Sequence, residues 1–546
     1  MTTLEHDRVR GPVPEDVEIA IVGSGLGALV AGARLARQGL KVAIFESHTV
    51  AGGCATHFAR GPRSARYHFD VGLHYIGDCT PGGVIPRILR TVGIDLEYAA
   101  MDPDGFDTLV FPDLEFRIPI RIDVYRDRLV AAFPHERRGI DKYVRLLRQV
   151  MRAGERLDAK GGRLGLRDMV ALAFDMYGLG RNQNRTIGEV LAGWIRDPRL
   201  RAVLCGQSGD YGLPPSKVSA FLHLGLAGHY FRGAFYPKGG GQIIADRLAA
   251  EIEKAGGTIH LGHGVSKIIV RDGRAQGLEL EAKAGAAPRT VRAKVVLSNA
   301  DLRLTLEHLV GLANLPASWV ARVPQLEMAA ALFMTFLGVK ADMPAKGMRA
   351  TNYWQFDDYD MEGLYGADAD DAQGGKPIRS RGCYVTSATL KDPESAAFHA
   401  PTGVTNIEVM TIVPGNIERW NVTDADCDAF AYKDNAPYRD QKARLEEEMV
   451  ARLEKLFPGT RESIVYRESA TPVSHRRYTR ATDGTGYGLA ATPAQFLKNR
   501  PGYRGPLDGL YLCGASTRSG HGIVGAMTSG ENAAKRILKD LGRARE

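Results

Sequence analysis

Gly23-Ser24-Gly25-Leu26-Gly27-Ala28 lies between a short apolar run, Val17–Val22, and a stretch with small residues at helical spacing, Leu29–Gln38. The apolar run is typical of a buried parallel strand, and the stretch after the glycines of a helix. A glycine-rich turn between them lets backbone N–H groups approach a pyrophosphate at the positive end of the helix dipole. The segment therefore predicts a dinucleotide-binding unit of the Rossmann type.

The residues of this unit have separate predicted roles. Gly23 makes the tight turn, Gly25 lets a phosphate come close, and Ala28 stands where a third glycine is usual. A second predicted strand, Lys41–Phe45, ends on Glu46, twenty-three residues after Gly23. This is the expected distance for a carboxylate that accepts hydrogen bonds from an adenosine ribose.

Length and composition set the limits of the fold. A chain of 546 residues predicts two or three domains, and its apolar and charged fractions are those of a globular protein. The six cysteines form no CxxC pair, so we expect neither a disulfide framework nor a metal site, and a reducing, cytoplasmic location. Residues 1–16 are polar and predict a flexible N-terminus without a secretory signal. No apolar run reaches the eighteen residues that a bilayer span needs.

The net charge of +8 is concentrated in one stretch. Tyr125–Asp168 holds twelve Lys/Arg against six Asp/Glu, and the apolar stretch Met169–Tyr177 follows it. Basic residues beside a short apolar helix favour contact with an anionic membrane surface. The alternative is a solvated basic helix followed by a buried one. No recognition motif or interleaved aromatic residues accompany the charge, so nucleic acid is not an expected partner.

A second glycine pair follows the acidic strand, in Ala51-Gly52-Gly53-Cys54-Ala55-Thr56. This segment resembles the one after the ribose-binding acid in FAD enzymes of the amine-oxidase and phytoene-desaturase superfamily. The resemblance implies that FAD is the cofactor. With a single nucleotide fingerprint in the chain, FAD is expected as a tightly held group, and NAD(P)H only as a transient reductant.

Two further motifs narrow the resemblance. His74-Tyr75-Ile76-Gly77 and Ala234-Phe235-Tyr236-Pro237-Lys238-Gly239-Gly240 are similar to segments of the retinol saturases and carotenoid isomerases of that superfamily. The resemblance implies that the second motif returns the chain to the FAD domain beside the flavin. His74, Tyr75 and Tyr236 are the candidate catalytic residues. Their alternative role is that of core residues with satisfied hydrogen bonds.

The C-terminal region resembles the carotenoid-desaturase signature. Gly509–Ala515 is typical of a strand entering a tight turn, and His521–Ala526 opens the last predicted helix. Small residues at that helix N-terminus can approach the flavin, and the helix dipole favours negative charge on the reduced cofactor. Cys513 departs from the more common small aliphatic residue and is interpreted as a structural thiol.

Eighteen residues are predicted cofactor contacts. They lie on or beside the motifs above, on the predicted strand-end turn of Asp70 and Gly72, and on Gly262–Ser266, where the superfamily has backbone contacts to the adenine half of FAD. They are Gly23, Gly25, Leu26, Gly27, Ala28, Glu46, Ser47, Gly52, Gly53, Cys54, Gly72, Val265, Ser266, Gly514, Ala515, Gly522, Ile523 and Val524.

The predicted fold class is α/β: a Rossmann-type FAD-binding domain built from three segments, with an inserted α+β substrate domain. The FAD-binding segments are 17–85, 232–305 and 465–546, and the substrate segments are 86–231 and 306–464. Alternating apolar residues in Phe106–Phe133 predict an antiparallel hairpin. The strand-like runs between 326 and 413 predict antiparallel strands that roof a cavity.

The predicted function is that of an FAD-dependent oxidoreductase that saturates a C=C bond of an apolar isoprenoid, polyene or lipid. The resemblance leaves a carotenoid-type desaturase and a flavin-dependent cis-trans isomerase as alternatives. From a different class, the chain could be a lipid-binding flavoprotein without turnover. The His74–Gly77 and Phe235–Gly240 motifs point away from the amine oxidases. The oligomeric state is not predicted.

Overall fold

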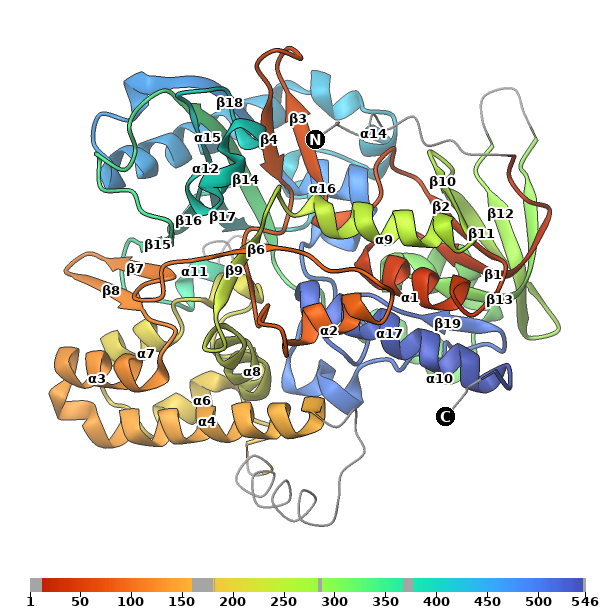
Figure 1. Cartoon of the computed structure of the whole chain (residues 1–546), viewed down its shortest axis with the longest axis horizontal. Helices are drawn as coiled ribbons and strands as arrows, with labels where there is room; N and C mark the ends of the chain where they lie inside the picture. The colour runs from red at the N-terminus through yellow and green to blue at the C-terminus, as the bar shows by residue number, and fades with distance from the viewer. Residues whose placement is uncertain (1–11, 160–179, 181, 283–286, 367–376, 544–546) are drawn as a thin grey trace.

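The computed structural model describes residues 12–159, 180, 182–282, 287–366 and 377–543. In Figure 1 these residues form two large sheets that lie on opposite sides of the molecule, with a group of helices below the second sheet. The first sheet combines strands from residues 16–46, 258–298 and 510–512, and the second combines strands from residues 107–118, 331–413 and 464–470.

The first sheet has seven strands in the order β10-β2-β1-β13-β12-β11, with β19 beside β13. Strands β10, β2, β1, β13 and β19 are parallel, and β11 and β12 extend the sheet as an antiparallel meander. The strands are β1 (Asp16–Val22), β2 (Val42–Glu46), β10 (Thr258–Leu261), β11 (Val265–Arg271), β12 (Arg274–Leu280), β13 (Thr290–Ser298) and β19 (Leu510–Leu512). This parallel core confirms the predicted α/β, Rossmann-type class.

Helices pack against one face of this sheet and bury its apolar side chains. They are α1 (Leu26–Ala36), α2 (Val84–Arg90), α9 (Gln242–Lys254) and α17 (Gly522–Asp540). Two glycines set the distance between α1 and α17. A Cβ atom on Gly530 of α17 would lie 2.1 Å from the carbonyl oxygen of Gly27 of α1, well inside van der Waals contact. The helices can therefore cross closely only because Gly530 has no side chain.

The second sheet also has seven strands, in the order β18-β14-β17-β16-β15-β7-β8. All neighbours are antiparallel except β15 and β7, and α15 (Ala436–Leu456) packs on one face. The strands are β7 (Asp107–Phe111), β8 (Leu114–Ile118), β14 (Ala331–Val339), β15 (Asn352–Phe356), β16 (Gly382–Thr386), β17 (Thr405–Val413) and β18 (Ile464–Ala470). The predicted boundary at residue 465 falls inside β18, so it needs correction: the second sheet continues to residue 470.

The region 120–230 is mainly helical. Its described helices are α3 (Ile122–Ala132), α4 (Arg137–Ala159), α6 (Ile187–Ala192), α7 (Pro198–Leu204) and α8 (Ala220–Tyr230). The hairpin expected over Phe106–Phe133 ends at Ile118, and α3 replaces its second half. Tyr125 and Leu129 are the buried residues of α3 and are spaced four apart, as on one face of a helix. The apolar stretch 169–177 lies outside the described residues.

Two small sheets connect the two large sheets. The strands β3 (His57–Arg60) and β4 (Tyr67–Asp70) form one of them, and β5 (Ile76–Gly77), β9 (Ala234–Pro237) and β6 (Tyr98–Ala100) form the other. Ile76 pairs with Phe235 and Gly77 with Ala234, so the two motifs that resemble the saturases are neighbouring antiparallel strands. The remaining short helices are α10 (Ala317–Arg322), α11 (Gly363–Gly366), α12 (Ala388–Lys391), α13 (Ala396–His399), α14 (Asp424–Asp428) and α16 (Pro472–Thr479).

The glycine contact between α1 and α17 makes a prediction about stability. Gly530→Ala must push the two helices apart, and such overpacking costs about 1–3 kcal/mol of the free energy of unfolding. Gly154→Ala is the matched control, because Gly154 lies in α4 with open space where its Cβ would be. That control should gain about 0.5–1 kcal/mol from its higher helix propensity. Urea denaturation of both variants measures the difference, and equal stabilities would contradict the close contact.

Candidate functional site

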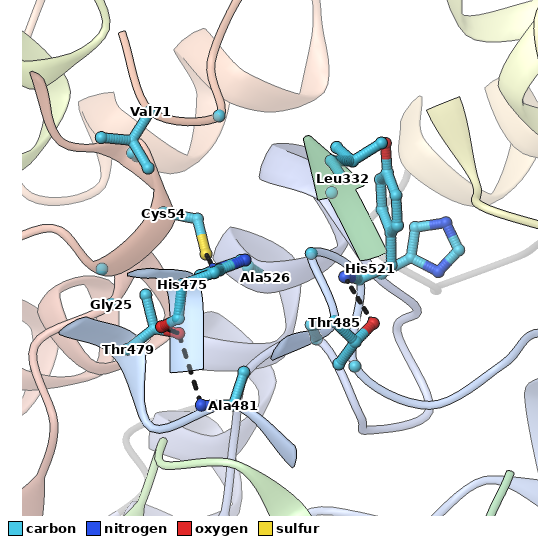
Figure 2. Close-up of a pocket in the computed structure, with 18 of the residues that line it drawn as sticks. Gly25, Cys54, Val71, Leu332, His475, Thr479, Ala481, Thr485, His521 and Ala526 are labelled. Atoms are coloured by element: carbon cyan, nitrogen blue, oxygen red, sulfur yellow. Dashed lines mark hydrogen bonds between the residues drawn. The ribbon is translucent and has the colours of Figure 1, made fainter. Parts of the chain in front are cut away.

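A cavity of about 1200 Å³ lies between the two large sheets. One wall comes from the glycine loop, the end of β2, the segments 52–56 and 71–76, and the start of α17. The opposite wall comes from β14, β15, β16, β17 and α8. Figure 2 shows part of it, with Gly25 and Cys54 on one side and His521 and Leu332 on the other. The volume exceeds the usual range for small-molecule sites, as expected for a site that takes a dinucleotide and a second molecule.

The glycine loop has no room for side chains. Gly23 has a φ of +81°, and a Cβ on Gly25 would lie 2.5 Å from Nδ2 of Asn299. A Cβ on Gly27 would lie 2.7 Å from Oδ1 of Asn299, the same oxygen that accepts a hydrogen bond from the N–H of Ala28 at 3.1 Å. Asn299 follows β13 and was not predicted as a site residue. It holds the loop open at the N-terminus of α1, where backbone N–H groups favour an anion.

Glu46 ends β2 beside this loop and is 8% exposed. Its Oε2 accepts from the backbone N–H and the hydroxyl of Ser24, both at 2.8 Å. Its Oε1 accepts from the N–H of His48 at 2.7 Å and from the hydroxyl of Ser47 at 3.2 Å. These donors anchor the carboxylate at the cavity wall, so its geometry fits a partner for ribose hydroxyls.

The second glycine pair brings another backbone segment against the loop. Gly52 and Gly53 have φ values of +131° and +59°, and the N–H of Gly52 donates to the carbonyl of Ser24 at 3.0 Å. Cys54 follows, with its Sγ 3.5 Å from Nε2 of His475 (Figure 2). Cys54 is exposed to the cavity, and desolvation by the protein around the cavity raises the pKa of its thiol to about 11. The thiol is therefore protonated at neutral pH and is not a nucleophile.

The N-terminus of α17 is the second helix end at the cavity. Gly522, Ile523 and Val524 line it, and His521 is the residue that precedes the helix. Both ring nitrogens of His521 are buried and have no hydrogen-bond partner among the described residues, and burial beside Arg500 lowers its pKa to about 3. An unpartnered imidazole at a cavity wall fits a site whose polar ligand supplies the missing hydrogen bonds.

Most of the predicted cofactor residues line this one cavity. They are Gly23, Gly25, Leu26, Gly27, Glu46, Ser47, Gly52, Gly53, Cys54, Gly72, Val265, Gly514, Ala515, Gly522, Ile523 and Val524. Ala28 and Ser266 do not line it: the N–H of Ala28 is bonded to Asn299, and the hydroxyl of Ser266 donates to the carbonyl of Glu279 at 3.1 Å. His74 and Tyr75 line the cavity, but Tyr236 is fully buried behind its wall and donates to Asp70. Its placement therefore corrects the expectation that all three aromatic residues face the site.

A buried charge network supports His74. Its Nδ1 lies 2.7 Å from Oε2 of Glu408, and Oε1 of Glu408 accepts from the N–H of Asp70 at 2.8 Å. Lys391 donates to the carbonyl of His74 and lies 4.7 Å from the centre of the Tyr236 ring. Burial lowers the pKa of Lys391 to about 8, against the opposing effect of Glu408 and Asp70, and burial beside Glu408 raises the pKa of Asp70. Lys391 and Glu408 come from α12 and β17, and no sequence motif marked them.

Tyr75 points to a different group of polar residues. Its hydroxyl lies 2.6 Å from Oδ2 of Asp210 and 3.0 Å from Oδ2 of Asp107. Around this group the wall is apolar and aromatic, which suits a conjugated hydrocarbon. The apolar residues that line the cavity include Phe221, Leu222, Leu226, Leu332, Met334, Phe336, Trp354, Phe356 and Phe496.

Comparison with known proteins agrees with this geometry. A family model described as an NAD(P)-binding Rossmann-like domain matches residues 21–92, and one described as a flavin containing amine oxidoreductase matches residues 431–538. The chain is 27% identical to the all-trans-retinol 13,14-reductase of Danio rerio, over 94% of this chain and 85% of that protein. It is also 27% identical to the prolycopene isomerase of Daucus carota, over 96% of this chain and 81% of the relative.

Solved structures share the fold. An oxidoreductase from Methanosarcina mazei has a TM-score of 0.60 at 17% identity, with 96% of this chain and all of that chain covered. Cyclohexylamine oxidase from Brevibacterium oxydans has a TM-score of 0.58 at 16% identity, with 97% and 100% covered. With these matches the fold and the cavity are those of an FAD-dependent oxidoreductase. The matches confirm the resemblance to the superfamily of the phytoene desaturases and retinol saturases that the sequence motifs carried.

The position of Glu46 predicts its importance for FAD. Glu46→Ala removes the acceptor for the ribose hydroxyls and should cost about 1–3 kcal/mol, a five- to 150-fold weaker FAD affinity. Glu46→Gln keeps one acceptor oxygen, so its FAD affinity should lie between those of Glu46→Ala and the wild type. FAD content after gel filtration and FAD titration of the apoprotein measure this. Glu115→Ala, an exposed residue of β8, is the control. FAD at wild-type stoichiometry and affinity in Glu46→Ala would contradict the assignment.

Proposed function

We propose that the protein is an FAD-dependent oxidoreductase that saturates a C=C bond of an apolar isoprenoid, polyene or lipid. The observation that supports it most is the composition of the cavity. The cavity is lined by the glycine loop that would bind a dinucleotide, by aromatic and apolar side chains, and by buried acids. The retinol reductases and prolycopene isomerases that the chain resembles over most of its length are named for polyene substrates.

The residues fit FAD in the order expected along an extended cofactor. Glu46 would hold the adenosine ribose, and the N–H groups at the start of α1 the pyrophosphate. The glycine pair at 52–53 and the N-terminus of α17 would border the flavin end, and His521 would receive a hydrogen-bond partner there. When bound, FAD supplies hydride transfer to or from carbon. The protein supplies orientation, an apolar environment and a proton at the neighbouring carbon.

Saturation is preferred over desaturation because of the two paired motifs. His74–Gly77 and Phe235–Gly240, which resemble the saturase side of the superfamily, form neighbouring strands beside the cavity. A desaturase would run the transfer in reverse and need an oxidant, and an isomerase would leave the substrate mass unchanged. The prolycopene isomerase relatives make isomerisation the second candidate.

A reductant is also required, and the cavity has a cationic end that suits NAD(P)H. Lys433, Arg439 and Lys442 line the cavity where α15 begins, and no ion pair joins them to a carboxylate of the described residues. Unpaired cations at the mouth of a cavity attract an anionic ligand such as a dinucleotide phosphate. NAD(P)H would bind transiently at this end of the cavity, without a second Rossmann domain in the chain to hold it.

The basic part of the helical region supports contact with a membrane surface. Arg138, Lys142 and Arg145 are exposed on α4, and their spacing puts them on one face. The opposite face of α4 is buried against α8 through residues that include Tyr143 and Leu147. Among the described helices, none has the length and apolarity to cross a bilayer. We propose that α4 rests on anionic lipid and that the substrate enters from there.

The three reactions are separated by the mass of the product. We expect the purified holoenzyme, incubated without oxygen with NADPH, NADH or dithionite and a panel of polyenes, to yield a product heavier by two hydrogens. Mass spectrometry of the extracted lipid measures it, and heat-inactivated enzyme is the control. A two-hydrogen loss under oxygen would show a desaturase, and an unchanged mass with an altered absorption spectrum would show an isomerase. Either result would overturn saturation.

Membrane contact is tested by co-sedimentation with liposomes. We expect binding to vesicles that contain anionic lipid and weaker binding as salt rises, because exposed charges are screened over about 8 Å at physiological ionic strength. Replacement of Arg138, Lys142 and Arg145 by Gln should weaken it. The matched control removes Lys267, Arg271 and Arg289, which are exposed on the distant β11–β13 meander. Equal binding to neutral and anionic vesicles, or binding unchanged in the α4 variant, would count against the proposal.

A further inference from the structure

Two buried carboxyl groups share one phenol beside the cavity. The Tyr75 hydroxyl lies 2.6 Å from Oδ2 of Asp210 and 3.0 Å from Oδ2 of Asp107, both hydrogen-bond distances. A phenol has one hydrogen and can donate to only one of the two oxygens. If both carboxyl groups were ionised, the other short contact would be between two oxygens without a proton. One of the carboxyl groups must therefore carry the second proton.

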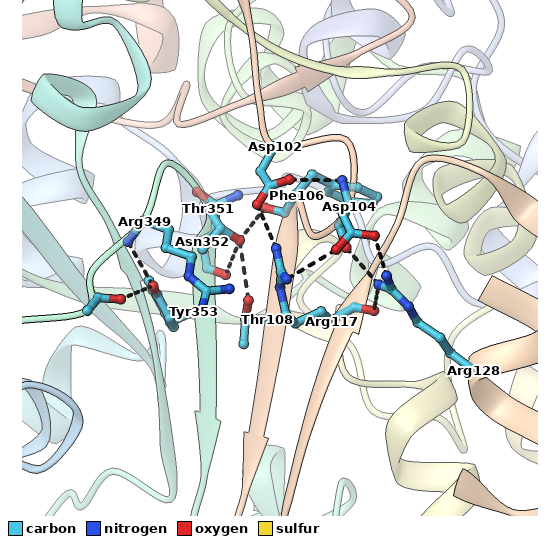
Figure 3. A network of polar contacts seen from close by, with 11 residues as sticks. Asp102, Asp104, Phe106, Thr108, Arg117, Arg128, Arg349, Thr351, Asn352 and Tyr353 are labelled. Carbon is cyan, nitrogen blue, oxygen red and sulfur yellow. Dashed lines mark hydrogen bonds and ion pairs between the residues drawn. The ribbon is translucent and has the colours of Figure 1, made fainter. Parts of the chain in front are cut away.

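The hydrogen-bond donors around each carboxyl group decide which of the two carries this second proton. Asp107 accepts from the side-chain amides of Gln207, at 2.6 Å to Oδ2, and Asn352, at 2.8 Å to Oδ1. These donors stabilise a carboxylate. The strand that bears Asn352 is fixed to β7 by hydrogen bonds around Thr351 and Phe106 (Figure 3). Asp210 has only the phenols of Tyr75 and Tyr230 as hydrogen-bonding side chains, with neither an amide donor nor an ion pair among the described residues. The extra proton therefore resides on Asp210, which donates to Tyr75, and Tyr75 donates to Asp107.

Only one of the two acids reaches the cavity. Asp210 lines it, whereas Asp107 is fully buried behind Tyr75. The wall around Asp210 is aromatic: Tyr75 stacks on Tyr230 with ring centres 4.4 Å apart, and Tyr384 contacts the ring of Trp354 at 4.6 Å. A flat conjugated chain against these rings would have the Asp210 carboxyl as its nearest acid.

We propose that Asp210 is the catalytic acid that protonates the second carbon of the C=C bond, with Tyr75 and Asp107 as positioning residues. This assignment rests on the proposed function. One carbon receives the hydride that reduced FAD supplies, and its neighbour receives the proton from the Asp210 carboxyl. The π bond is lost, two C–H bonds form, and the Asp210 carboxylate that remains regains its proton from water.

The charges around Asp210 agree with this role. Burial, and then the charge of Asp107, raise the pKa of Asp210 to about 8, and burial raises that of Asp107 to about 6. Besides Asp107, the titratable groups that face Asp210 are the phenols of Tyr75, Tyr211, Tyr230, Tyr365, Tyr384 and Tyr487. A general acid works only in its protonated form, so its contribution is complete below pH 8 and declines as the pH rises through that value.

The proton itself can be observed without substrate. The infrared difference spectrum between the FAD-loaded wild type and Asp210→Asn at pH 7 should contain the C=O stretch of a protonated carboxyl group, present in the wild type alone. In the wild type this band should disappear as the pH rises through about 8. A spectrum without that band at pH 7 would overturn the assignment.

The kinetic test uses enzyme whose flavin has been reduced beforehand, mixed without oxygen with the polyene that the wild type saturates. Asp210→Asn should slow flavin reoxidation by about 10²–10⁴-fold, with unchanged FAD content and unchanged flavin reduction. The loss of rate above pH 8 should vanish in this variant. Asp210→Glu should restore part of the rate and the pH dependence. Asp434→Asn, on the exposed surface, is the control.

The two possible failures are distinguishable. If the wild type saturates a polyene and Asp210→Asn does so at the same rate and with the same pH dependence, the acid is another group and the proposed function stands. If the wild type saturates none of the polyenes, the proposed function fails and the donor role fails with it.

Discussion

The close crossing of α1 and α17 at Gly27 and Gly530 is the contact on which the cofactor site depends. It places two helix N-termini at the same cavity, and the partial positive charges of both favour an anionic ligand there. Asn299 fills the remaining space between the glycine loop and the strand β13. A side chain at any of these glycines would separate the helices or block the loop, so the site tolerates little variation in backbone position.

A second constraint is the burial of charge on the opposite side of the cavity. The neighbouring residues His74 and Tyr75 reach into two separate networks, one with Glu408 and Lys391 and the other with Asp107 and Asp210. Burying so many ionisable groups costs free energy unless each finds a partner. In both networks the partners come from the second sheet, the short helix α12 or the helical region. The site is therefore complete only when the FAD-binding part and the substrate part of the chain pack together.

The motifs that were predicted correctly depend on short stretches of backbone. A strand, a glycine turn and a helix within thirty residues specify the nucleotide unit, and Glu46 follows at a fixed distance along the next strand. The helix α3 was missed because alternation and helical spacing overlap in a short segment with few apolar residues. Tyr236 was assigned to the cavity because of its motif, although the strand pairing of β9 turns its ring toward Asp70.

The sequence by itself determined the fold class, the cofactor and the superfamily, because the glycines and the acid that define them act through the local backbone. The acids and bases on the far side of the cavity were decided only by the tertiary structure. Asp107 and Asp210 are about one hundred residues apart, and Lys391 and His74 more than three hundred, so no local pattern relates them. Their pKa values follow from burial and from neighbours that only the packed sheets provide.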